Sequence, residues 1–259
     1  MTMKFGTIAS GSSGNCLYAG NEDTHILIDA GISCKRICEG LKEFELDGKD
    51  IQGILITHEH TDHIAGIGVL SRKFHIPIFG TEKTLKAIAG MGNLGKIDSG
   101  LFQPIRSGQV FSLGSLTVDS FSISHDAADP VSYILRDGSK KLGMVTDLGY
   151  YDEAVVDALK ASNLLYVEAN HDIHMLQAGP YPYYLKRRIL GDKGHLCNEM
   201  AASLVNEVMS DSLSRVILGH LSKENNYPDL ALAAVKNEVA DSLQIQVAPR
   251  DHAGLLMDL

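Results

Sequence analysis

The feature that most constrains this chain is a run of metal-binding side chains directly after an apolar segment. Residues 51–57 predict a buried strand, and positions 58–63 then read H-E-H-T-D-H. Neutral imidazole and carboxylate are ligands of zinc, iron and manganese. Because these groups would be poorly satisfied at a strand end unless a cation gathered them, the spacing H-x-H-x-D-H predicts a metal site.

Composition describes an ordinary globular protein. The chain has 259 residues, of which 44% are apolar and 21% charged, and a chain of this length needs no disulfide or metal merely to fold. Its net charge of −9 argues against a protein that coats DNA through a broad basic face, but not against a nuclease with a local basic groove. The four cysteines form no C-x-x-C pair, which predicts free buried thiols in a reducing cytosol.

The sequence also bears on the compartment. The N-terminal residues contain no apolar segment typical of a signal peptide, and no run of about 18 apolar residues occurs. We therefore expect a cytoplasmic protein that makes no membrane contact.

Hydrophobic periodicity predicts how the chain is organised. Strands are expected at residues 3–9, 16–19, 25–28, 51–57, 76–79, 110–113, 116–124, 131–136, 141–146, 164–168, 215–218 and 243–247. Helices are expected at residues 33–44, 65–73, 82–89, 152–161, 183–190, 198–209 and 228–239. This order predicts an α/β (α+β) four-layer αββα sandwich, and since no linker or repeat divides it, residues 1–259 are expected to form a single domain.

The H-x-H-x-D-H motif after a buried strand resembles the metallo-β-lactamase superfamily. The resemblance implies that His58 and His60 bind one metal, and that Asp62 and His63 bind a second. It also implies that Asp29, in L-I-D-A-G, orients the motif without binding metal.

Three more ligands are expected downstream, each after a predicted strand. In the family's order, His125 matches the third ligand of the first metal, Asp147 the carboxylate that bridges both metals, and His220 the last ligand of the second. The implied cofactor is a pair of divalent ions, zinc or manganese, with iron also possible.

Such a pair suggests a mechanism. Two metals about 3.5–4 Å apart would lower the pKa of a shared water toward neutrality and clamp the oxygens of a phosphodiester, so that activated hydroxide attacks. Asp62 would bind metal with one oxygen and position the attacking water with the other.

Other segments narrow the choice within the superfamily. A bridging Asp147 in place of a cysteine resembles the hydrolase and nuclease branches, and the short intervals on either side of it leave no room for a tRNA-binding arm or an inserted domain. The segments at positions 9–15, 168–172 and 219–226 resemble the compact YycJ/VicX-type (WalJ-like) group of 5′-to-3′ DNA exonucleases.

These resemblances favour a two-metal phosphodiesterase that acts on single- or double-stranded DNA as a 5′-to-3′ exonuclease. The alternative is a small-molecule metallo-hydrolase, such as a thioesterase, lactonase or cyclic phosphodiesterase, that uses the same ligands. A non-enzymatic binding module is a third hypothesis, against which the complete ligand set argues. The sequence leaves the oligomeric state open.

A proton donor is suggested by a second resemblance. His195, in G-H-L-C, is similar to the Gly-His-Ser-Thr segment of the tRNA-processing branch, which implies a general acid with Glu168 as its partner. The other interpretation is an incidental histidine near a helix start. His171 and His174 stay open between contact with phosphate or a metal and loop surface.

Substrate contacts are expected from one basic stretch and two loops. Residues 181–188 interleave tyrosines with Lys186, Arg187 and Arg188, which could grip phosphates while the tyrosines stack on bases. The same pattern suits a helix with a solvated cationic face. Further candidates to contact the substrate are Lys223 and, in the small-residue turn at 10–15, Ser12, Ser13 and Asn15, although that turn can also be a plain strand connection that needs its glycines.

Overall fold

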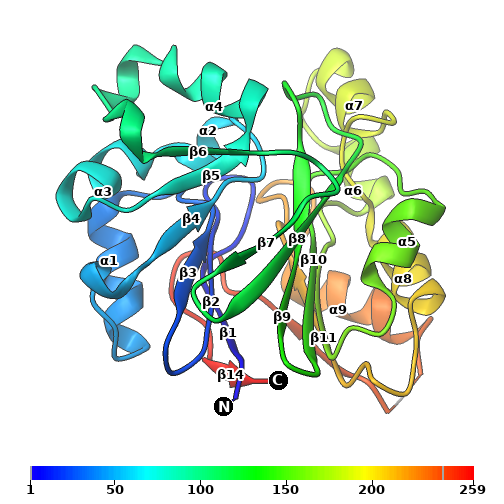
Figure 1. The fold of residues 1–259 in the computed structure, drawn as a ribbon. Helices are drawn as coiled ribbons and strands as arrows, with labels where there is room; N and C mark the ends of the chain where they lie inside the picture. Colours follow the sequence, from blue (N-terminus) through cyan, green and yellow to red (C-terminus); the bar gives the residue numbers. More distant parts are fainter. Residues whose placement is uncertain (1, 241) are drawn as a thin grey trace.

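The structure, a computed structural model that describes residues 2–240 and 242–259, contains two facing β-sheets with helices on their outer sides (Figure 1). The first sheet has the order β14-β1-β2-β3-β4-β5-β6. Its strands are β1 (Lys4–Ala9), β2 (Cys16–Gly20), β3 (His25–Ile28), β4 (Gly53–Leu55), β5 (Ile78–Thr81), β6 (Phe102–Ile105) and β14 (Met257–Asp258).

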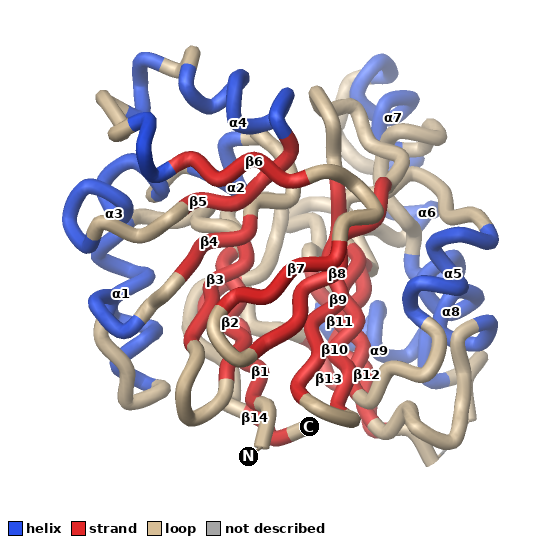
Figure 2. Tube along the Cα trace, viewed as in Figure 1, coloured by secondary structure: helices blue, strands red, loops and turns tan. Residues whose placement is uncertain are grey.

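The second sheet faces the first and has the order β13-β12-β11-β10-β9-β8-β7 (Figure 2). Its strands are β7 (Val110–Leu113), β8 (Leu116–Ser122), β9 (Val131–Asp137), β10 (Lys140–Val145), β11 (Leu164–Glu168), β12 (Arg215–Gly219) and β13 (Gln244–Val247).

Helices cover both outer faces (Figure 1). Beside the first sheet lie α1 (Cys34–Glu43), α2 (Thr61–Ile64), α3 (Ile67–Phe74) and α4 (Glu82–Ala89). Beside the second lie α5 (Glu153–Leu159), α6 (Ile173–Ala178), α7 (Tyr183–Ile189), α8 (Asn198–Glu207) and α9 (Pro228–Lys236). Short 3₁₀ turns occur at Gly48–Asp50, Gly92–Leu94 and Ser99–Leu101.

Three apolar cores hold these four layers together. Because successive side chains of a strand point to opposite faces, Ile54 of β4 packs under the helices while Leu55 packs between the sheets. On β11, Leu165 likewise faces the helices and Tyr166 faces the other sheet. Each sheet is therefore buried on both faces, which confirms the αββα sandwich expected from the sequence.

Strand direction places the candidate site. Strands β3 to β6 are parallel to one another, as are β10 to β13. Strand β8 runs in the direction of β10, because both are antiparallel to β9. Carboxyl ends of parallel strands share one edge of a sheet, where ligands commonly bind, and the seven predicted metal ligands follow these ends.

One predicted helix differs from the structure. The sequence predicted a helix at 65–73, but helical structure already begins at Thr61, so Asp62 and His63 lie in α2. The helix then breaks at Gly66, whose N–H bonds to the Ala30 carbonyl. A β-carbon there would lie 2.0 Å from the Ile32 carbonyl oxygen, so this close approach requires glycine.

Two simpler expectations can also be compared with the structure. All four cysteines are free thiols, as expected, but Cys38 is only half-buried. No helix in the described part of the chain combines the length and apolar character needed to span a membrane.

Candidate metal centre and active site

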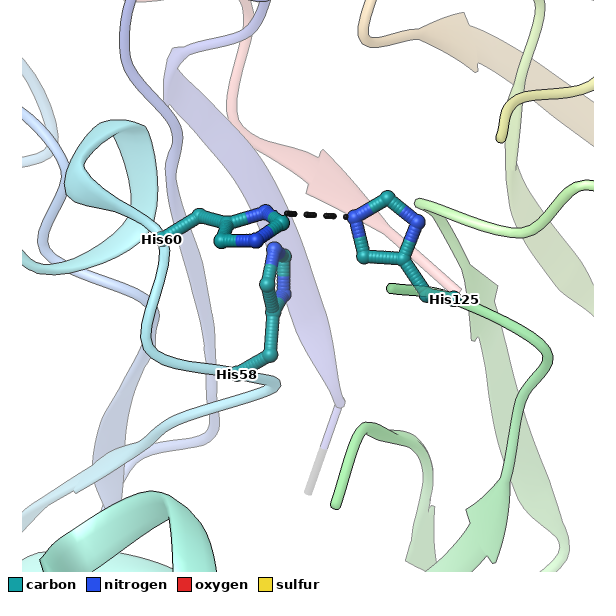
Figure 3. A group of neighbouring side chains, drawn as sticks. All are labelled: His58, His60 and His125. Atoms are coloured by element: carbon teal, nitrogen blue, oxygen red, sulfur yellow. Dashed lines mark hydrogen bonds between the residues drawn. The ribbon is translucent and has the colours of Figure 1, made fainter. Parts of the chain in front are cut away.

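Three histidines, two from the first sheet and one from the second, converge where strands of both sheets end (Figure 3). His58 and His60 follow β4, and His125 follows β8. The ring centroid of His58 lies 4.5 Å from that of His60 and 4.8 Å from that of His125. His60 Nδ1 lies 3.2 Å from His125 Nε2. One ligand atom from each of the three rings can face a common ion.

A second group lies beside the first and shares Asp147 with it. His63 Nε2 is 3.4 Å from an Asp62 oxygen, and His220 joins these two residues. Asp147 Oδ2 is 3.3 Å from His63 Nε2, and its Oδ1 is 3.2 Å from His220 Nε2 and 3.9 Å from His125 Nε2. The Asp147 carboxylate therefore lies between the two groups.

In four of the histidines, the Nδ1 atom is occupied by a hydrogen bond within the protein, which leaves the Nε2 atom to face the site. The Nδ1 atom of each lies within hydrogen-bond distance of an oxygen of the protein. These oxygens are the Asp29 carboxylate for His63 at 2.7 Å, the Gly194 carbonyl for His125 at 3.1 Å, the Asn15 amide for His220 at 3.2 Å and the Thr57 hydroxyl for His58 at 3.0 Å. With Nδ1–H donating, Nε2 keeps its lone pair for a cation.

Burial keeps three of these four rings in the neutral form that a cation needs, and His63 differs. Burial lowers the pKa of His125 and of His220 to about 4, and lowers that of His58 well below its ordinary value. Burial would also lower the pKa of His63, but the carboxylates of Asp147, Asp29 and Asp62 raise it well above the ordinary value.

One unpartnered atom supports the same conclusion. His58 Nε2 is buried and has no hydrogen-bond partner among the described residues. A buried polar atom without a partner costs roughly 1–3 kcal/mol, and a bound cation would remove that cost. The donor set of neutral imidazoles and carboxylates fits divalent metal ions.

Asp29 supports this arrangement from behind. Its buried carboxylate accepts the Thr57 N–H at 2.9 Å and lies 2.7 Å from His63 Nδ1. Asp29 thus fixes the His63 ring through its outer nitrogen, and Thr57 is a supporting residue that the sequence analysis missed. Asp29, Asp147 and His220 have φ values of 61°, 59° and 53°, conformations that cost about 1 kcal/mol each and that cluster at functional sites.

Glu168 and His195 lie next to the two groups. Glu168 ends β11 fully buried, and its oxygens accept the N–H groups of Asp147 and Leu196 at 2.5 and 2.6 Å. His195 Nδ1 is 3.3 Å from Glu168 Oε2, whereas its Nε2 makes no hydrogen bond to any described residue. Burial lowers the pKa of His195, but Glu168 more than compensates and raises it to about 9.

The basic stretch is only partly directed to the site. Lys186 donates to the carbonyls of Gln177 and Gly179, both at 2.7 Å, so its ammonium closes the end of α6 and is not free on the surface. Arg188 donates from Nε and Nη2 to the two oxygens of Asp126, at 2.5 and 3.1 Å. Arg187 is exposed to solvent.

Asp126, which the sequence analysis did not single out, connects Arg188 to the metal centre. Its Oδ1 lies 3.5 Å from His125 Nε2 and 3.9 Å from His60 Nε2. Glu59 holds the same loop, because its Oε1 accepts the Ala128 N–H at 2.8 Å. The position of Glu59 inside the histidine motif was the one signal in the sequence that pointed to it.

The predicted substrate contacts in the turn at residues 10–15 differ in their burial. Asn15 is buried between two histidines: its Oδ1 lies 3.2 Å from His220 Nδ1, and its Nδ2 lies 3.2 Å from His63 Nε2. Ser12 and Ser13 are exposed, as is Lys223 in the loop after His220.

The two uncertain histidines lie in different surroundings. His171 is buried, which rules out loop surface, and neither of its ring nitrogens has a partner among the described residues. Burial lowers the pKa of His171 to about 4. His174 is exposed on α6.

The fold and the site together define a metal-dependent hydrolase. Residues 24–221 match the family described as the Beta-lactamase superfamily domain, and the chain belongs to this family. It is 42% identical to exodeoxyribonuclease YycJ of Bacillus anthracis, over 91% of this chain and 88% of that protein. It is 38% identical to exodeoxyribonuclease WalJ of Streptococcus pneumoniae, over 92% and 89% of the two chains.

Solved structures show the same fold at lower identity. The metallo-β-lactamase fold protein YhfI from Bacillus subtilis superposes with a TM-score of 0.75 at 17% identity, and covers all of both chains. The short form of human tRNase Z superposes with a TM-score of 0.68 at 15% identity, over 97% of this chain and 98% of that one. The family match and the 42% and 38% identities confirm the resemblance to the YycJ/WalJ-type metallo-hydrolases, and these structures confirm the fold.

Proposed function

We propose that this chain, acting as a single domain, is a two-metal phosphodiesterase that removes nucleotides from DNA in the 5′-to-3′ direction. The observation that carries the proposal is the Asp147 carboxylate, which lies between the two ligand groups and 3.7 Å from the Nδ1 of His195, a histidine held by Glu168. The preference for DNA is supported by the two relatives named exodeoxyribonucleases, which match most of the chain.

Seven side chains would hold the metals. His58, His60 and His125 would hold one ion, Asp62, His63 and His220 would hold the other, and Asp147 would serve both groups. Two divalent cations would supply Lewis acidity toward phosphate oxygens there and would lower the pKa of bound water. Zinc and manganese both suit these donors.

Asp62 would orient the attacking water. One of its oxygens faces His63, and its side chain is 26% exposed, the largest exposed fraction among the proposed ligands except that of His60. The second oxygen is then free to accept a hydrogen bond from water and to hold that water in line with the phosphorus atom.

His195 would give a proton to the leaving oxygen. Glu168 keeps Nδ1 occupied and favours the protonated ring, so Nε2–H is the group directed to substrate. Since Glu168 also accepts the Asp147 N–H, one carboxylate fixes both the proton donor and the bridging ligand.

Phosphates of the strand would be held by exposed cations around this centre. Arg187 and Arg188 would contribute from α7, Lys223 from the loop after β12, and Ser12 and Ser13 would offer hydroxyls from the first turn, and all five side chains are exposed. Lys186 would act indirectly, by joining α7 to the end of α6.

The experiment is cleavage of 5′-end-labelled single- and double-stranded DNA by metal-stripped protein reloaded with manganese or zinc, beside Asp62→Ala. Short labelled products that appear with metal and vanish in Asp62→Ala are expected. Intact DNA from fully metal-loaded protein would instead favour the small-molecule hydrolase, whose substrates would then be screened.

A further inference from the structure

The outer face of α7 carries exposed tyrosines and arginines, of which Arg188 also pairs with Asp126. Tyr183 and Tyr184 are each 75% exposed, which is unusual for such large rings. Residues four apart lie on the same side of a helix, so Tyr184 is aligned with Arg188, and Tyr183 with Arg187. Lys186 lies on the inner side, where it contacts the end of α6.

The side of α7 that carries Tyr184 and Arg188 is connected to the proposed metal centre by hydrogen bonds. Arg188 makes two hydrogen bonds to Asp126, whose Oδ1 lies 3.5 Å from His125 Nε2. The end of α7 also accepts a hydrogen bond from the segment of the proton donor, because the His195 N–H bonds to the Ile189 carbonyl at 3.0 Å. At 1.5 Å per residue, Tyr184 stands about 6 Å along the axis from Arg188.

Charge favours a polyanion on this face. The whole chain has a net charge of −9, yet α7 contains no acid and its outer face carries Arg187 and Arg188. An exposed aromatic ring next to arginines is typical of surfaces that bind nucleic-acid strands, where the ring stacks on a base and the cation holds the backbone. A nucleobase follows each phosphate of a strand, so a phosphate at Arg188 brings a base within reach of Tyr184.

We propose that Tyr184 is a stacking subsite for the base next to the phosphate that Arg188 contacts at the metal centre. The inference rests on the proposed nuclease function and makes it more specific. The enzyme then recognises a base that has one face not stacked on another base. Such a base occurs at an unpaired strand end or in the terminal pair of a duplex.

Fluorescence of 2-aminopurine tests this directly, since stacking quenches it. A phosphorothioate oligonucleotide that carries the base analogue at its 5′ end is titrated with metal-loaded protein, as a single strand and as a blunt duplex. Binding of the wild type should quench the fluorescence of the single strand, of the blunt duplex or of both. The form that is quenched shows whether the stacked base comes from an unpaired end or from a terminal base pair. Tyr184→Leu should abolish the quenching and raise Kd by about 5- to 100-fold.

Salt dependence separates stacking from charge. Tyr184→Leu should weaken binding without changing the slope of log K against log salt, whereas Arg188→Gln should reduce that slope by about 0.7–0.9. Tyr184→Phe, which keeps the ring, and Tyr183→Leu, on the adjacent side of the helix, are matched controls that should bind like the wild type.

Two results would overturn the subsite. One is a Tyr184→Leu protein that quenches and binds like the wild type while still cleaving DNA, and the other is equal loss in Tyr183→Leu. Failure of the wild type to bind or cleave any DNA would instead count against the proposed function itself.

Discussion

At the scale of single residues, the site depends on which nitrogen each histidine directs inward. His63 directs Nε2 to Asp62 and Asp147 because Asp29 occupies its Nδ1. His60 is the exception, with Nδ1 facing His125. A residue that touches no ion can thus control whether an ion binds.

Asp29 provides the first test of that idea. Asp29→Asn removes the charge that holds the His63 ring, and we expect affinity for zinc or manganese to fall about 10- to 100-fold. Competition with a chromophoric chelator measures this loss. Asp23→Asn, an exposed carboxylate outside the site, is the matched control and should bind metal like the wild type. Unchanged affinity in Asp29→Asn would contradict the supporting role.

His195 provides the second test. If its Nε2–H protonates the leaving oxygen, His195→Ala should lower kcat on DNA by about 10²- to 10⁴-fold, because a positioned acid contributes that much. Cleavage of a p-nitrophenyl phosphodiester, whose leaving group needs no proton, should change little. Equal losses on both substrates, at unchanged metal content, would show that His195 acts in another way.

The role of a residue could be predicted from the sequence where the residue belongs to a motif. It could not be predicted where the role depends on a contact with a residue far away in the chain. His58 could be singled out from its motif after an apolar strand, and His125, Asp147 and His220 because they follow strands in the ligand order of the family that the motif resembles. Asp126 could not, since its role depends on Arg188, which lies 62 positions away in the chain. Lys186 looked like a phosphate contact, but nothing in the sequence indicates that the carbonyls of Gln177 and Gly179, at the end of α6, accept hydrogen bonds from its ammonium.

At the scale of elements, the segment after β3 must approach α2 very closely. The N–H of Asn15 bonds to the Asp62 carbonyl, and Gly31 packs against the same carbonyl. A β-carbon on Gly31 would lie 1.6 Å from that oxygen, so only glycine fits. Helix α2, which carries Asp62 and His63, is therefore positioned by contacts between backbones.

Substitution of Gly31 tests this contact. Gly31→Ala forces the two segments apart, and we expect the free energy of unfolding to fall by about 1–3 kcal/mol, measured as a decrease in Tm of ~2–12 °C. Gly92→Ala is the matched control, because no atom lies within 4 Å of the added carbon. A Gly31→Ala protein with the Tm of the control would refute the close approach.

Most strands were predictable because their apolar runs end in turn residues, and the failures have physical causes. Strand β6 contains Pro104 and two exposed residues, so its pattern does not distinguish a strand from a loop, and its place at the sheet edge tolerates the proline. Helix α6 has six residues and a single buried side chain, which is too short for a periodic signal. Neither element carries a proposed metal ligand.

At the scale of the whole molecule, the residues that form the apolar cores are different from those proposed to bind metal. The three cores fill the spaces between layers and include none of the seven proposed ligands. We therefore expect the metal-free protein to remain folded, with far-ultraviolet circular dichroism close to that of the metal-bound form.

Metal should nevertheless stabilise the fold, because only the native state assembles the ligands. At a free concentration 100 times Kd, binding adds about 2.7 kcal/mol, so chelation should lower Tm by ~5–11 °C and re-addition of metal should restore it. A Tm indifferent to chelator and to added metal would mean that no ion binds at this site.

We propose that two metals, held where the strands of both sheets end, hydrolyse a phosphodiester of DNA. The most direct measurement adds manganese or zinc in steps to metal-free protein and follows both bound metal per chain and nucleotide release from 5′-labelled DNA. Our account predicts binding of two equivalents and cleavage that appears only as the second is bound. Protein that holds two equivalents and leaves DNA intact, or that cleaves at full rate without metal, would contradict it.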